Sequence, residues 1–147
     1  MPIAARRAEV VWEGTLEQGN GSFTVGDWVV GEVPVTWESR TRTPGGNTSP
    51  EELLAASHAS CYAMALSQVL DQGGAPPERL EVAATCTLDL VGSDFRITRV
   101  DLDVRGRVPG LDEEGFRSAA EEAEQECPVS NALRGNVDIQ LNATLEG

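Results

Sequence analysis

Positive charge is scarce in this 147-residue sequence, which holds 11 lysine and arginine residues against 24 aspartate and glutamate residues. The resulting net charge of −13 and pI of about 4.3 would repel a phosphate backbone, and no basic stripe offsets that repulsion. The same charge disfavours an anionic membrane surface. We therefore expect neither a nucleic acid nor a membrane as a partner.

Histidine and cysteine are also few. With one histidine and no CxxC pair, nothing in the sequence has the ligand spacing of a zinc site, and we expect no metal ion. The three cysteines, Cys61, Cys86 and Cys127, are an odd number and lie far apart. That arrangement does not suit a scaffold of structural disulfides.

An N-terminal export signal is missing as well. Arg6 and Arg7 resemble the basic start of a signal peptide, but Glu9 and Glu13 interrupt the apolar run that should follow. We therefore expect a reducing compartment, the cytoplasm. Residues 53–70 carry no charge and could span a membrane by length, but their three serines, five alanines, histidine and glutamine disfavour that interpretation.

This uncharged run belongs to a predicted helix over residues 49–72. Ser49 can cap the helix, Pro50 suits its first position, and Glu52 completes a capping box. A helix that is mostly apolar on every side is usually buried on every side. Because short strands cannot cover it, we expect a homodimer in which two such helices are buried together.

The remaining elements are mostly strands. An N-terminal antiparallel meander is predicted from four short segments: residues 8–14, 22–25, 28–30 and 33–39. Asn20-Gly21 has the composition of a hairpin turn, and residues 40–48 form a polar linker to the helix. After the helix come two long strands, a second helix and a last strand: residues 80–91, 95–108, 112–126 and 137–145. This order predicts a single α+β domain over residues 1–147 with antiparallel sheets.

Cys61, in the middle of the long helix, is the first candidate for chemistry. A free cysteine is often a small buried apolar residue, and a mid-helix position lacks the dipole that lowers a thiol pKa. Activation would need a nearby cation, for which Arg40 and Arg42 are candidates, although either could be an ordinary solvated charge. His58, one turn earlier, could be a general base or a hydrogen-bonded buried histidine.

Cys127 ends the apolar stripe of the second helix, just before a helix-breaking proline. It could resolve a sulfenic acid formed on Cys61, or it could fill the core. Glu51 suits the dipole at the start of the long helix, and ideal helical rise places it about 15 Å along the axis from Cys61. Cys86 lies in a predicted strand without an evident partner and is interpreted as structural.

Two segments surround the cysteines with distinctive sequences: NTSPEELLAASHASCYAMALS over residues 47–67 and ECPVSNALRGNVDIQL over residues 126–141. With the VVWEG start and the order of elements, they closely resemble the OsmC/Ohr family of thiol-dependent peroxidases. WESRTRTPGGNTSPEEL and the helix end ALSQVL resemble the osmotically inducible (OsmC) branch. SNALRGNVDI is more similar to the organic hydroperoxide resistance (Ohr) branch.

The resemblance implies a role for each matched residue. Cys61 would be the peroxidatic cysteine and Cys127 the resolving cysteine. Arg40 would activate the thiol, with Arg42 as a substitute, and Glu51 would orient the guanidinium through a bidentate pair. The family fold is an intertwined homodimer, in which antiparallel sheets wrap two central helices and the sites lie at the dimer interface.

We therefore predict a cytoplasmic peroxidase of the oxidative stress response that reduces organic hydroperoxides and also hydrogen peroxide. A Cys61 sulfenic acid would be resolved by Cys127 as an intramolecular disulfide, which an external thiol, such as a lipoyl dithiol, would reduce. No cofactor is required. Two alternatives stay open: a non-catalytic dimer that binds a small apolar ligand on the same fold, and a purely structural dimer.

Overall fold

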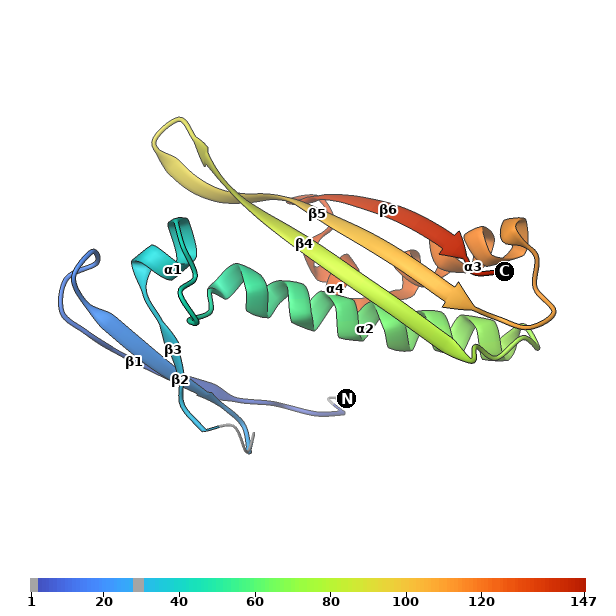
Figure 1. The fold of residues 1–147 in the computed structure, drawn as a ribbon, viewed down its shortest axis with the longest axis horizontal. Coiled ribbons are helices and arrows are strands. Elements are labelled where there is room, and N and C mark those ends of the chain that lie inside the picture. Colours follow the sequence, from blue (N-terminus) through green and yellow to red (C-terminus); the bar gives the residue numbers. More distant parts are fainter. Residues whose placement is uncertain (1–2, 28–30) are drawn as a thin grey trace. The chain divides into compact units, whose positions relative to one another are not determined.

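The computed structural model of the chain describes residues 3–27 and 31–147. They form two compact units, which divide at Leu53 and Leu54 within the long helix α2 (Pro50–Gln72) (Figure 1). Each unit has its own three-stranded sheet, β1-β2-β3 in the first and β4-β5-β6 in the second. The mixture of helices and sheets makes this an α+β protein, as predicted.

The first unit holds the predicted antiparallel meander, formed by β1 (Ala8–Glu13), β2 (Asn20–Val25) and β3 (Val33–Val35). Asn20-Gly21 begins β2 and is not the hairpin turn that was predicted. The chain has already reversed before it, because Gly14 adopts a φ of 95° and the Gly19 amide donates to the Thr15 carbonyl. The predicted strand over residues 28–30 lies outside the described residues.

The strand predicted over residues 33–39 is too long. β3 stops at Val35, and a short helix α1 (Trp37–Thr41) follows. A capping box starts this helix: the Thr36 hydroxyl accepts from the Ser39 amide, and the Ser39 hydroxyl accepts from the Thr36 amide. A helix of little more than one turn leaves no periodicity for a sequence pattern to reveal.

The second unit contains a mixed sheet of β4 (Arg79–Val91), β5 (Asp94–Arg107) and β6 (Asp138–Leu145). β4 and β5 form the predicted long antiparallel hairpin, but β6 runs parallel to β5. The prediction of purely antiparallel sheets is therefore wrong here. The chain passes through α3 (Glu113–Glu126) and α4 (Pro128–Leu133) between the two strands, and such a crossover permits parallel pairing.

Helices cover one face of this sheet. Alternate side chains of β5, including Val100 and Leu102, are buried and pack with Tyr62 and Leu66 of α2 and with Phe116 of α3. The Tyr62 hydroxyl also donates to the Ala120 carbonyl at 2.8 Å, and this hydrogen bond joins α2 to the middle of α3. The apolar packing of this core joins α2, which carries Cys61, to α3, which leads to Cys127.

Helix α2 is not buried on every side in the single chain. By length and composition α2 could cross a membrane, but core helices of soluble proteins can have the same length and composition. Tyr62 and Leu66 lie in the core, whereas Met64 is 69% exposed. Among residues 3–27 and 31–147, the expected burial of α2 on every side is therefore not seen.

Candidate functional site

Cys61 and Cys127 meet in the second unit. Cys61 lies mid-way along α2, and Cys127 is the residue between α3 and α4. The Cys127 thiol donates to the Cys61 sulfur, and the two Sγ atoms are 3.4 Å apart. Both thiols are free; Cys127 is fully buried and Cys61 is partly exposed. Two residues 66 positions apart are thus placed within reach of one another.

The corner between α3 and α4 sets the position of Cys127. Its backbone is extended there (φ −65°, ψ 117°), the conformation that the following proline favours. Side chains from the far side of the corner satisfy the last carbonyls of α3: Asn131 donates to the Gln125 carbonyl at 3.0 Å and Arg134 to the Glu124 carbonyl at 3.1 Å. Arg134 also pairs with the Glu124 carboxylate at 2.9 Å. The corner is therefore held by its own contacts.

His58, one turn before Cys61, is fully buried and bonds to the corner. Its Nε2 lies 2.7 Å from the Ser130 hydroxyl oxygen. Burial lowers the pKa of His58, and the Glu124 carboxylate partly opposes that shift. The structure thus shows the hydrogen-bonded buried histidine of the two alternatives. No sequence pattern indicated Ser130. The one feature that could have pointed to it is its position three residues after Cys127.

The pKa of the Cys61 thiol is raised in the single chain. Burial is the main cause, a hydrogen bond from the Val129 backbone lowers the pKa in part, and the neighbouring Cys127 raises it further. None of these causes is a cation. A pKa raised in this way disfavours the thiolate form of Cys61.

Arg40 and Glu51 form the second pair of predicted site residues, within the first unit. Arg40 Nε donates to Glu51 Oε1 at 2.9 Å and Nη2 donates to Oε2 at 3.2 Å, so the expected bidentate pair is present. The guanidinium also lies 5.9 Å from the centre of the Trp37 ring. Glu51 is buried, and Arg40 belongs to α1 where a loop was predicted. Of the two candidate arginines, Arg40 is the one that pairs with Glu51, whereas Arg42 follows α1 and is exposed.

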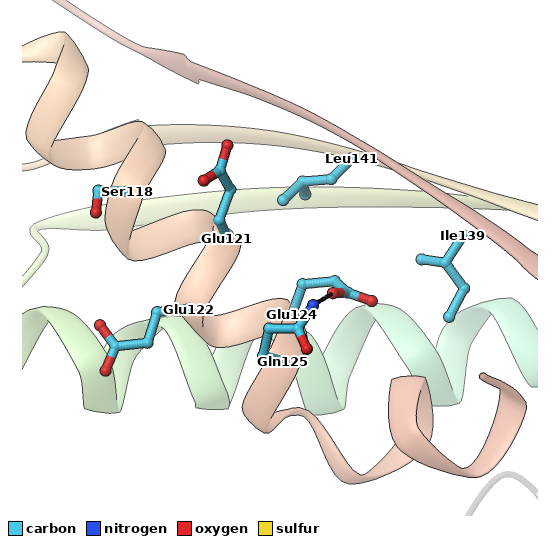
Figure 2. A pocket seen from close by; sticks show the side chains of 7 residues that line it. All are labelled: Ser118, Glu121, Glu122, Glu124, Gln125, Ile139 and Leu141. Carbon is cyan, nitrogen blue, oxygen red and sulfur yellow. Dashed lines mark hydrogen bonds between the residues drawn. The ribbon is translucent and has the colours of Figure 1, made fainter. Parts of the chain in front are cut away.

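Other candidate sites carry less chemistry. Cys86 on β4 packs against the core, in agreement with a structural role. In residues 3–27 and 31–147, no group of three or more histidine, cysteine, aspartate or glutamate side chains could hold a metal ion. A pocket between α3 and β6 is lined by Glu121 and Glu124 on one side and by Ile139 and Leu141 on the other (Figure 2). Neither Cys61 nor Cys127 lines it.

Residues 43–142 match the family model of the OsmC-like proteins. The chain belongs to this family. Peroxiredoxin OsmC of Escherichia coli (strain K12) is 34% identical over 94% of this chain and 97% of its own length. Organic hydroperoxide resistance protein-like 2 of Staphylococcus epidermidis (strain ATCC 35984) is 33% identical over 69% of this chain and 71% of its own length. The predicted membership of the OsmC/Ohr family is confirmed, and the OsmC match extends over more of the chain.

Solved structures agree with this membership. The organic hydroperoxide resistance protein OhrB of Bacillus subtilis aligns with a TM-score of 0.74 at 29% identity, over 94% of this chain and 98% of its own. The names of these OsmC and Ohr relatives support a redox function related to peroxides. In α2, Tyr62, Leu66, Val69 and Leu70 lie in the core of the second unit, as expected for a core helix of a soluble protein.

The short distance between the two sulfurs predicts that mild oxidation joins Cys61 to Cys127. Diamide should give an intrachain product lighter by two hydrogens, because Sγ atoms 3.4 Å apart need to approach by only about 1.4 Å to form a disulfide of about 2.05 Å. Peptide mapping by mass spectrometry checks the linkage. A Cys86→Ser variant should give the same product; a principal linkage through Cys86 would contradict the geometry.

Proposed function

We propose that this protein is a cytoplasmic thiol-dependent peroxidase that reduces organic hydroperoxides and also hydrogen peroxide. The observation that carries the proposal is the pair of free thiols, Cys61 and Cys127, with sulfurs 3.4 Å apart in an OsmC-like chain. The names of its relatives, a peroxiredoxin and an organic hydroperoxide resistance protein, support the same chemistry.

The reaction has three steps. The Cys61 thiolate attacks the terminal oxygen of the hydroperoxide, so that an S–O bond forms, the O–O bond breaks and the alcohol leaves with a proton. The Cys127 thiolate attacks the resulting sulfenic sulfur; an S–S bond forms and the hydroxyl group leaves as water. An external dithiol of the lipoyl type then reduces the disulfide by thiol–disulfide exchange. No cofactor takes part.

The difference in exposure between the two thiols agrees with a peroxidatic role for Cys61 and a resolving role for Cys127. Cys61 is partly exposed and can meet a peroxide, whereas Cys127 is fully buried and is sheltered from one. Apolar side chains surround the pair, since both cysteines pack with the core of the second unit. An apolar approach to Cys61 favours an organic hydroperoxide, because burying its tail contributes about 0.8 kcal/mol per methylene group.

Arg40 supplies the positive charge that the surroundings of Cys61 lack. Its pair with the buried Glu51 uses Nε and Nη2 and fixes the plane of the guanidinium. Nη1 takes no part in that pair and can face a thiolate or a peroxide oxygen. A fixed guanidinium lowers the thiol pKa and holds the peroxide at little further cost in side-chain entropy.

Two chains form an intertwined homodimer in this proposal, and the site is completed at its interface. Each unit leaves apolar side chains open to solvent: Val10 and Val11 on β1 of the first, Met64 on α2 and Phe95 on β5 of the second. Covering these side chains at an interface would remove their apolar surface from water. Sedimentation should give twice the 15.7 kDa mass of the chain, and a stable folded monomer would contradict the dimer.

Replacing each cysteine tests the proposed function. Cys61→Ser should abolish peroxide consumption, since the nucleophile is gone. Cys127→Ser should consume about one equivalent of organic hydroperoxide and then overoxidise at Cys61 on repeated exposure, because nothing resolves the sulfenic acid. Coupled consumption with a dithiol measures both variants, with Cys86→Ser as the matched control that keeps turnover. Retained turnover in Cys61→Ser would remove the catalytic assignment of Cys61.

Neutralising Arg40 tests the source of activation. Arg40→Met should lower kcat/KM for an organic hydroperoxide on the order of 10²-fold, the usual loss for one preorganised charged donor. The loss should shrink as the pH rises, since the thiolate fraction of a thiol with a raised pKa grows with pH. Arg42→Met is the matched control. An equal loss in both variants, or a loss independent of pH, would argue against this role of Arg40.

A further inference from the structure

One buried hydrogen bond joins helix α2 to the α3–α4 corner beside the two cysteines. His58 precedes Cys61 by three positions, and Ser130 follows Cys127 by three positions, so each partner lies about one helical turn from a sulfur. Both side chains are fully buried, and the Nε2–Oγ distance is 2.7 Å. A short hydrogen bond that is shielded from water is costly to break.

Most other polar contacts of the corner stay within the corner and α3. Asn131 and Arg134 bond to carbonyls of α3, so they hold the shape of the corner itself. The Tyr62 hydroxyl does cross from α2, but it reaches Ala120, seven positions before Cys127. Within the described residues, two side chains of α2 bond to the corner besides the contact of the two thiols: Cys61 accepts a hydrogen bond from the Val129 backbone, and His58 bonds to the side chain of Ser130.

The histidine ring depends on the same bond for its orientation. Its Nδ1 is buried and has no hydrogen-bond partner among the residues that the structure describes. Nε2 is thus the ring nitrogen that is hydrogen-bonded, and its partner Ser130 lies in the first turn of α4. Loss of either partner would remove the one hydrogen bond that the described residues give to the ring.

We infer that His58 and Ser130 are positioning residues for the resolving step: their hydrogen bond holds the Cys127 sulfur in line with the sulfur of Cys61. The inference rests on the proposed function, because resolution follows peroxide reduction. Neither residue touches the peroxide. Their hydrogen bond increases the fraction of time in which the Cys127 sulfur is placed to attack Cys61, once Cys61 carries a leaving group.

An aromatic disulfide, 5,5′-dithiobis(2-nitrobenzoate), measures this step without a peroxide. The Cys61 thiolate attacks it, a mixed disulfide forms on Cys61 and one aryl thiolate leaves. Cys127 then gives up its proton to the buffer and attacks the Cys61 sulfur; the protein disulfide forms and a second aryl thiolate leaves. Absorbance records the two releases in sequence. All chains carry Cys86→Ser, so that the third thiol does not contribute.

Ser130→Ala should lower the ratio of the second rate constant to the first about tenfold, the factor that corresponds to one buried hydrogen bond. His58→Leu should do the same, and the double variant should lose no more than either single one, since the two residues act through one bond. His58→Gln, whose amide can donate to Ser130, should restore most of the ratio. If Ser130→Ala does not fold, the comparison of His58→Leu with His58→Gln carries the same test.

Tyr62→Phe is the matched control, because it removes an equally buried hydrogen bond of α2 that lies away from the corner. A ratio within about twofold of the parent in Ser130→Ala, where a lost hydrogen bond should give about tenfold, would overturn the inference. An equal fall in Tyr62→Phe would overturn it as well. Failure of the proposed function is a separate result: peroxide would not be consumed while the second aryl thiolate is still released.

Discussion

The contact between the sulfurs of Cys61 and Cys127 is the constraint on which the proposed chemistry depends. It joins the middle of α2 to the end of α3 at 3.4 Å, and neither helix could hold it alone. The core packs α2 against β5 and α3, while the extended residue before Pro128 turns the chain so that Cys127 faces inward. Much of the second unit therefore serves to keep two thiols at a distance from which a disulfide can form.

The electrostatics of the chain are divided between its two units. In the second unit, burial and the neighbouring Cys127 raise the pKa of the Cys61 thiol. The first unit holds a guanidinium in a fixed plane through Arg40 and Glu51. A protonated thiol is a poor nucleophile, and the proposed function therefore assigns to Arg40 the positive charge that favours the Cys61 thiolate.

The elements with strong local signals were predictable. The capping serine and the uncharged run predicted α2, and alternating apolar residues predicted the β4–β5 hairpin. The parallel pairing of β6 was missed, because strand direction within a sheet depends on the crossover and not on the strand's own residues. Helix α1 was missed because the Thr36–Ser39 capping box spans only one turn.

The site was predictable in a different way. Family resemblance indicated the two cysteines and the pair of Arg40 with Glu51, whereas spacing along the chain could not show that the sulfurs meet. The His58–Ser130 bond joins residues 72 positions apart and leaves no local pattern. Contacts made only by tertiary packing of this kind lie beyond what a single sequence can reveal.

The most direct measurement is a time course of the reduced chain after one equivalent of an organic hydroperoxide, with trapping by dimedone and peptide mapping by mass spectrometry. The account predicts that the Cys61 peptide first becomes a trappable sulfenic acid. That species should then be replaced by a disulfide with the Cys127 peptide, lighter than the dithiol by two hydrogens. A first oxidation on Cys127, or a Cys61 thiol that stays unchanged while the chain is folded, would contradict it.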